Sequence, residues 1–449
     1  MDEEPKRYTV KPSQKNHMTI PWSEITTTTE DLAVVNVDIQ EKSRIIGRIG
    51  ILLLACGTGA WRVRESMNQV SRALNVICSS DVGLTTIEYT CIEKEYSSTQ
   101  VLSLPTTGVN TDQLNRLEHF VTQFSQNISQ YTVRQVHQRL DEFQAKKGNY
   151  SAITAGLAAG LACSGFIFLL GGGPIEMIYC FLAASLGNFV RKKMLDHHLT
   201  VLLCVAVGVM VACFTYLGLV RLFEITLGLS TTHEAGYIGA MLFVIPGFPF
   251  ITSGLDIAKL DMKSGLERLF HALSIIAVAT LVGWVAAYSF QLGPQDFVSL
   301  NLGILPLLLL RIPASFCGVL GFSIMFNSPK KMAVIAGCIG AVANTLRLEL
   351  VDIIHMPAGP AAFCGALTAG LLASLLRRKF DYPRIALTVP SIVIMVPGLY
   401  LYRAVYNMGI GSIEVGALWL TKAALIILFL PMGLMIARIL TDKKWRYCD

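Results

Sequence analysis

The chain has 449 residues, of which 53% are hydrophobic and only 15% are charged. This composition excludes an ordinary soluble protein of the same length and is typical of a protein with many membrane-spanning helices. The net charge of +6 is small, and we expect no nucleic-acid partner. The eleven cysteines contain no CxxC pair and mostly lie in apolar runs, which favours small core residues over disulfides or metal ligands.

The first third of the chain is polar and mixed. We predict a flexible polar tail over residues 1–40 and a small cytosolic α+β domain over 41–148. Within this domain Val63, Met67, Val70 and Leu74 recur at helical spacing. Residues 87–91 alternate between apolar and polar as a strand does, and 99–105 are expected to pair with them. Two further amphipathic helices are predicted around 114–124 and 133–143.

Ten apolar segments follow, each long enough to cross a bilayer. We place them at roughly 151–171, 174–190, 199–219, 236–252, 270–290, 302–326, 332–351, 358–376, 385–403 and 415–437. Basic residues gather on alternate connections, at 146–147, 191–193, 259–268, 330–331, 377–384 and 438–446. The positive-inside rule then predicts a multi-pass plasma-membrane protein with both termini and the polar domain in the cytosol.

Two of the ten segments are interrupted by a Pro-Gly pair. The fourth contains Pro246-Gly247 and the ninth contains Pro397-Gly398. Either pair alone reads as an ordinary proline kink, but the two occupy matching positions in the two halves. Five spans per half would reverse the orientation of the second half. We therefore predict an α-helical polytopic membrane protein built as a 5+5 inverted-topology repeat, with units at 149–297 and 298–449. Its central site is expected at the two breaks.

Polar residues follow the first break and are candidates for binding substrate or coupling protons. Thr252, Asp256 and Asp261 follow Pro246-Gly247, and Arg268 ends the segment. The two acids are five residues apart, so they would not share a face of one helix. Each is either a solvated loop acid or a carboxylate that holds an ammonium or a proton. Arg268 either pairs with Asp261 or Glu267 or anchors the cytosolic end.

The second half adds three more candidates. Arg311 lies in an apolar run between two prolines, where it either snorkels to the outer interface or binds a substrate carboxylate. Asn344 is a candidate for lining the pathway, whereas Arg347 and Glu349 are expected to pair at the interface. Tyr400 follows the second break, and the next residues, Tyr402 and Arg403, are expected in an aromatic belt.

The residues around both breaks resemble the threonine/serine exporter family. The most specific stretch is IPGFPFITSGLDIAKLDMKSGLERL at 245–269, with GFSIMFNSPKK at 321–331 and VPSIVIMVPGLYLYRA at 389–404. The polar domain contributes GTGAWRVRESMNQVSRALNV at 57–76, where Arg64 stands in place of an expected glutamate. The resemblance implies a cytosolic domain before two five-span units, favours Asp256 as the functional acid, and implies an ion pair for Arg268.

Together these features predict a secondary transporter and not an enzyme, with no catalytic residues, metal site or cofactor. The absence of a phosphate-binding loop favours coupling to an ion gradient, and the expected activity is export of threonine- or serine-like amino acids by proton antiport. Alternatives are export of a dicarboxylate such as succinate, a passive channel, and a membrane-anchored hydrolase using the polar domain. The expected partners are the small-molecule substrate, protons, the lipid bilayer and a second copy in a homo-oligomer.

Overall fold

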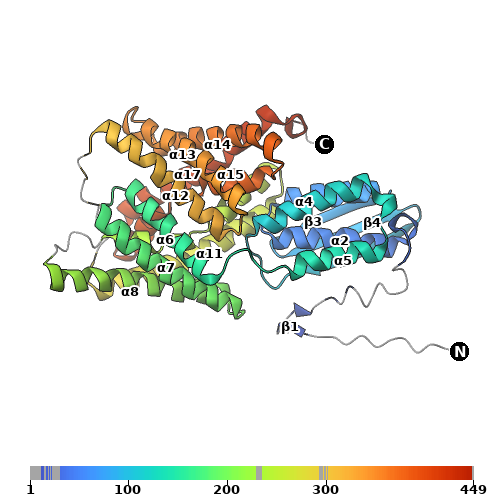
Figure 1. The fold of residues 1–449 in the computed structure, drawn as a ribbon, viewed down its shortest axis with the longest axis horizontal. Helices are drawn as coiled ribbons and strands as arrows, with labels where there is room; N and C mark the ends of the chain where they lie inside the picture. The colour runs from blue at the N-terminus through green and yellow to red at the C-terminus, as the bar shows by residue number, and fades with distance from the viewer. Residues whose placement is uncertain are drawn as a thin grey trace. The chain divides into compact units, whose positions relative to one another are not determined.

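A computed structural model of the chain describes residues 12–14, 17–18, 20, 22, 31–228, 235–292, 297, 300 and 302–446 (Figure 1). The chain forms two compact units. The first comprises Met1–Lys147 together with Lys259–Glu267, and the second comprises Gly148–Ala258 together with Arg268–Asp449. The segment Lys259–Glu267, which joins two helices of the second unit, therefore belongs to the first.

The first unit is a small α+β domain whose sheet has the antiparallel order β3-β4-β5. Its strands are β3 (Ile77–Val82), β4 (Thr86–Glu93) and β5 (Tyr96–Ser103), and its helices are α2 (Ile39–Ala55), α3 (Ala60–Ala73), α4 (Thr111–Gln126) and α5 (Val133–Ala145). Short elements are β1 (Pro12–Gln14), β2 (His17–Met18), η1 (Val34–Asn36) and η2 (Ile128–Gln130). In β4, Ile87, Tyr89 and Cys91 are buried, as the alternating pattern predicts. Helices α2 and α3 pack on the sheet, and α4 and α5 pack on these helices (Figure 1).

The expected helix at Val63–Leu74 and the pairing of β5 with β4 are confirmed. Helix α2 was not predicted from the sequence; 13 of its 17 residues are buried. Asp38 caps α2 by accepting a hydrogen bond from the Glu41 amide at 3.0 Å. Most of the expected tail lies outside the described residues, but Val34 is fully buried.

The second unit is helical and covers all ten expected segments. Its helices are α6 (Ala152–Leu169), α7 (Pro174–Asp196), α8 (Val201–Leu227), α9 (Tyr237–Ala240), η4 (Leu242–Val244), α10 (Gly247–Ala258), α11 (Met262–Ser289), α12 (Ile304–Met325), α13 (Lys330–Asp352), α14 (Ala358–Phe380), α15 (Arg384–Val393), α16 (Gly398–Gly409), α17 (Ile413–Thr441) and η5 (Lys443–Arg446). Among the described residues, seven helices are long and apolar enough to cross a membrane, or nine if each of two bent pairs is one span. The chain is thus a polytopic membrane protein. Helix α7, at the second expected segment, carries Glu176 and Arg191 and is not among the nine.

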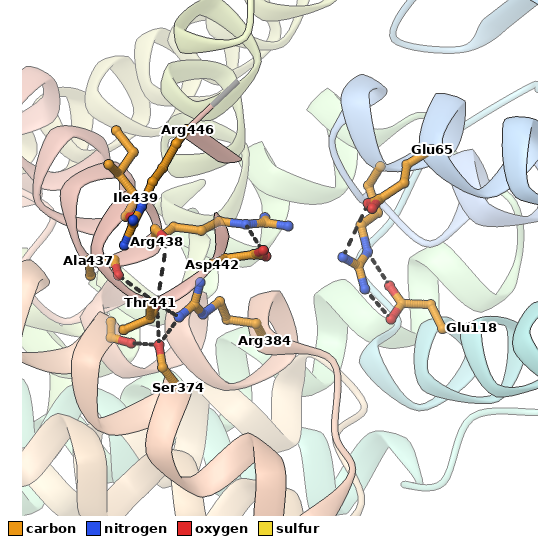
Figure 2. A network of polar contacts seen from close by, with 12 residues as sticks. Glu65, Glu118, Ser374, Arg384, Ala437, Arg438, Ile439, Thr441, Asp442 and Arg446 are labelled. Carbon is orange, nitrogen blue, oxygen red and sulfur yellow. Dashed lines mark hydrogen bonds and ion pairs between the residues drawn. The ribbon is translucent and has the colours of Figure 1, made fainter. Parts of the chain in front are cut away.

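A polar cluster fixes the start of α15 to its neighbours. The Arg384 guanidinium donates to the hydroxyl oxygens of Ser374 on α14 and Thr441 at the end of α17 (Figure 2). Arg438 pairs with Asp442 one turn further along α17. In the first unit, Figure 2 also draws Glu65 and Glu118, which both pair with Arg62. The α15 cluster thus anchors one end of a bent helix pair.

Candidate transport site

The two Pro-Gly breaks have the same backbone structure. Helix pairs α9–η4/α10 and α15/α16 bend by 52° and 50° at these points. At each break the glycine amide donates to the carbonyl two residues earlier, Gly247 to Ile245 at 2.8 Å and Gly398 to Val396 at 2.9 Å. Pro397 has φ −82° and ψ 56°, which is an inverse γ-turn centred on the proline. Each break therefore ends one half-helix sharply and starts the next at its glycine.

The breaks contact one another inside the second unit. A Cβ placed on Gly247 would lie 3.2 Å from side-chain carbons of both Val393 and Val396. A Cβ on Gly398 would lie 1.7 Å from Ile245 Cδ1. The glycines thus leave room for aliphatic side chains of the opposite break. Both turns are buried, so their backbone amides and carbonyls face protein and not lipid.

A buried ion pair lies beside the first break. Asp256 is fully buried on α10, and its Oδ2 lies 3.1 Å from Nε of Arg268, a residue only 2% exposed. The expectation that Arg268 pairs with Asp261 or Glu267 is wrong. Leu260, with φ 64°, ends the α10 segment, and α11 begins at Met262, so α11 carries Arg268 back alongside Asp256. Thr252 is also buried, but its hydroxyl donates to carbonyls of its own helix.

Asp261 has a different partner. Within the first unit, Arg64 Nη2 lies 2.5 Å from Asp261 Oδ1. Lys263 Nζ donates to Asp81 at 2.6 Å, and the Leu84 amide donates to Glu267 Oε2 at 2.6 Å. Arg64, which departs from the expected glutamate, is therefore the residue that holds Asp261. We call Lys259–Glu267 the clasped segment.

Arg311 is satisfied by two acids of the neighbouring helix. Its Nη1 donates to Glu349 Oε1 at 2.7 Å, and its Nη2 donates to Asp352. The expected pairing of Arg347 with Glu349 is wrong, because residues two apart on a helix point in different directions. Among the described residues Arg347 has no hydrogen bond or ion pair, and its Nε is buried. Asn344, 1% exposed, donates from Nδ2 to Ser315 Oγ at 2.9 Å.

Aromatic residues pack around the second break. The Tyr400 ring lies 5.1 Å from that of Trp419. Tyr402 is fully buried, and its hydroxyl forms a 2.8 Å hydrogen bond with the hydroxyl of Tyr237, next to the first break. The assignment of Tyr402 to an aromatic belt is therefore wrong, because its partner comes from another helix. Arg403, 7% exposed, lies over the Trp419 ring at 4.8 Å.

A small apolar cavity touches both breaks. It is lined by Met241, Val244, Ile245, Ile276, Ala279, Thr280 and Gly398. These residues come from the first break, from α11 and from the first residue of α16. The Thr280 hydroxyl already donates to carbonyls of α11. The cavity therefore provides space between the breaks, while the charged groups lie outside its lining.

The polar domain brings His137 into a buried network and not into a nucleophile–base pair. Arg48 Nη1 donates to His137 Nδ1 at 2.8 Å, so His137 Nε2 carries the proton donated to Glu41 at 2.8 Å. Both ring nitrogens are thus used. Cys78 and Cys91 face each other across β3 and β4, and a hydrogen bond from Cys91 lowers the pKa of Cys78. Among the described residues no group of His, Cys, Asp and Glu could hold a metal ion.

Comparison with known proteins decides the family. A family model described as "Putative threonine/serine exporter" matches residues 44–291, and a second model, "Threonine/Serine exporter, ThrE", matches residues 311–440. The chain belongs to the threonine/serine exporter family. The two matches include both Pro-Gly breaks, the ion pair at Asp256 and the clasped segment. The resemblance expected from the sequence is confirmed.

Curated relatives of this exporter-family chain carry two kinds of name. A "Probable threonine/serine exporter" of Mycobacterium tuberculosis is 25% identical over 416 residues, covering 88% of this chain and 75% of its own length. The "Probable succinate transporter subunit YjjP" of Escherichia coli is 26% identical over 255 residues, covering 55% of this chain and 95% of its own length. A similar subunit of Klebsiella aerogenes is 25% identical, covering 55% of this chain and 92% of its own length. No solved structure matches the chain.

Proposed function

We propose that this protein is a secondary transporter that exports small threonine- or serine-like amino acids across the plasma membrane by proton antiport. The observation that carries the proposal is the mutual packing of two broken helices beside a buried ion pair, Asp256–Arg268. Discontinuous helices expose backbone groups to a substrate at the centre of a membrane protein. Buried acids within membrane proteins commonly take part in proton relays.

Reciprocal contacts support an inverted-repeat architecture of two five-helix units. At the breaks, 151 residues separate the members of three pairs: Gly247 and Gly398, Leu242 and Val393, and Ile245 and Val396. Gly247 lies against the two valines, and Gly398 lies against Leu242 and Ile245. Such an exchange of equivalent partners is what a two-fold relation between the halves requires.

The same relation recurs where α6 meets α12. Gly165 lies against Ala314 and Gly318, and Gly321 lies against Ala158 and Ala162. Here 156 residues separate each residue from its counterpart. The sequence spacing is thus 151 residues for every pair at the breaks and 156 residues for every pair between α6 and α12. These values are consistent with two equivalent units whose connecting segments differ in length.

In the proposed cycle, the two breaks form a gate that opens and closes around the substrate. The cavity lined by Ile245, Thr280 and Gly398 lies between the two sides of this gate. The positive ends of the α10 and α16 helix dipoles lie at the breaks and would attract an anionic group. Protonation of Asp256 would weaken its attraction to Arg268 and release α11 from α10.

Three alternative functions are distinct from amino-acid export. The succinate-transporter name of the Escherichia coli relative favours a dicarboxylate substrate, which the same backbone amides could bind. A passive channel would use the same breaks without proton coupling. The hydrolase alternative has less support, because both nitrogens of His137 are occupied.

A substrate panel in proteoliposomes tests the proposal. Vesicles loaded with labelled threonine, serine, alanine or succinate would be diluted into buffer with or without an imposed pH gradient. Efflux that rises with the gradient and is accompanied by proton counter-flow supports the antiporter. Efflux that does not depend on the pH gradient supports a channel. Efflux of succinate alone supports the dicarboxylate alternative.

Cysteine labelling tests the proposed orientation. In a cysteine-free background, Ile354→Cys, in the exposed connection between α13 and α14, should react with an impermeant maleimide in intact cells. Asp196→Cys, at the exposed end of α7, should react only after permeabilisation. The reason is the concentration of basic residues on the Asp196 side. The opposite labelling pattern would show that the protein has the reverse orientation in the membrane.

The polar domain is proposed to regulate transport through the clasped segment. This segment is covalently joined to Ala258, two residues after Asp256, and to Arg268 itself. Its Asp261 and Glu267 are held by Arg64 and the Leu84 amide. A movement of the domain would therefore reach both members of the buried ion pair.

Arg64→Ala should release the clasped segment. We expect faster amide hydrogen exchange over residues 259–267 and a changed maximal transport rate, with the preference among substrates unchanged. Arg72→Ala, an exposed residue of the same helix, is the matched control and should change neither measurement. A loss of substrate binding in Arg64→Ala would instead make the domain part of the site.

A further inference from the structure

The most unusual charge in the second unit is that of Arg347 on α13. The helix is long and apolar enough to cross the membrane, and the Arg347 Nε is buried without a hydrogen bond. The two acids near the end of α13, Glu349 and Asp352, are both bound by Arg311. An arginine that lies in a membrane span while the neighbouring acids are bound by another residue is suited to bind an anionic ligand.

Arg347 lies at the second break. A Cβ placed on Gly365 of α14 would be 3.2 Å from Arg347 Cβ and 3.1 Å from Met395 Sδ. Met395 is two residues before Pro397, so the stem of Arg347 packs where the α15/α16 pair is interrupted. The titratable groups with an electrostatic effect on Arg347 are Tyr400, Asp352 and Arg311. The Arg347 side chain therefore starts beside the second break.

Asn344 adds a second polar group on the same face. It precedes Arg347 by three residues, a spacing that places two side chains together on a helix. While its Nδ2 donates to Ser315, its Oδ1 is buried and accepts no hydrogen bond from a described residue. The pair thus offers a cationic fork and a neutral acceptor. An α-amino acid presents the complementary groups, a carboxylate and an ammonium.

We infer that Arg347 and Asn344 form the subsite that recognises the substrate carboxylate. In this subsite, Asn344 Oδ1 accepts a hydrogen bond from a substrate donor next to the carboxylate. This inference rests on the proposed transport function, and it assigns the carboxylate role to Arg347 and not to Arg311. A planar guanidinium binds a carboxylate through two parallel hydrogen bonds, which a lysine cannot reproduce. The subsite discriminates against analogues that lack the carboxylate, because they would leave the guanidinium without an anionic partner.

Ligand-induced thermal stabilisation of the purified full-length protein tests this subsite. The probes are L-threonine and succinate, compared with L-threonine amide and succinamide, in which each carboxylate is replaced by an uncharged carboxamide. The unmodified protein should be stabilised by at least one carboxylate and not by the corresponding carboxamide. Arg347→Gln should weaken carboxylate binding by about 10- to 100-fold and abolish the discrimination. Arg347→Lys should recover only part of it, and Arg221→Gln, an arginine paired on α8, should behave like the unmodified protein.

A second measurement separates binding from a structural role. Arg347→Met removes a charge that has no hydrogen bond or ion pair among the described residues, so the ligand-free variant should have a Tm equal to or above that of the unmodified protein. A clear fall in Tm would show that Arg347 is structural and would overturn the inference, as would full carboxylate discrimination in Arg347→Gln. Proton-driven efflux is measured separately. Its absence alongside intact carboxylate discrimination would remove the antiport mechanism but retain the Arg347 subsite.

Discussion

Asp256→Asn is expected to abolish transport driven by a pH gradient. The asparagine has almost the same shape but cannot ionise, so proton release at this position is lost. The substitution also leaves Arg268 buried without its negative partner. Removing one member of a buried ion pair typically costs about 3–5 kcal/mol of folding free energy. Both transport in vesicles and thermal stability therefore need to be measured.

A double variant separates the two effects. Asp256→Asn combined with Arg268→Gln removes both charges, and it should recover much of the lost stability while remaining inactive under a pH gradient. Exchange of substrate between the two sides without a gradient is the additional readout, because proton release is not needed for exchange. Normal gradient-driven efflux by Asp256→Asn would show that the proton is carried elsewhere. Recovery of such efflux in the double variant would show that the pair is only structural.

Gly398→Leu is expected to block the path between the two breaks. A single Cβ at this position would already lie 1.7 Å from Ile245 Cδ1, so a leucine must displace the opposite break. Overpacking of this kind costs about 1–3 kcal/mol, which a membrane protein of this size should tolerate. We expect loss of substrate binding with a folded protein, measured by thermal shift and by gel-filtration profile. Gly247→Leu should act in the same direction.

The contact between the breaks can be tested by compensation. Gly398→Ala should reduce transport more than Gly247→Ala, since the space at Gly247 is larger, with its neighbours at 3.2 Å. Ile245→Ala removes the atom that an alanine at Gly398 would meet, so it should restore activity to Gly398→Ala. Gly218→Ala, where no atom lies within 4 Å, is the neutral control. If Ile245→Ala gives no rescue, the two breaks do not touch in the functional protein.

Much of the architecture could be predicted from the sequence, because its determinants are local. A run of about 20 apolar residues indicates a span by its length alone. Pro246-Gly247 and Pro397-Gly398 end helices wherever they occur, because proline lacks an amide proton and clashes with the preceding turn. The structure has a helix at every expected segment and a bend at both breaks. The orientation in the membrane and the two-fold repeat remain predictions.

Only the tertiary structure decided which side chains form ion pairs and hydrogen bonds with each other. Asp256, and not Asp261, meets Arg268, because the chain reverses at Leu260 and brings α11 back along α10. Tyr237 and Tyr402 are 165 residues apart and share a hydrogen bond. Helix α2 was not predicted from the sequence, although its apolar residues recur at helical spacing. Ion pairs and hydrogen bonds form across a few ångströms of space, and sequence spacing constrains them only within a single helix or strand.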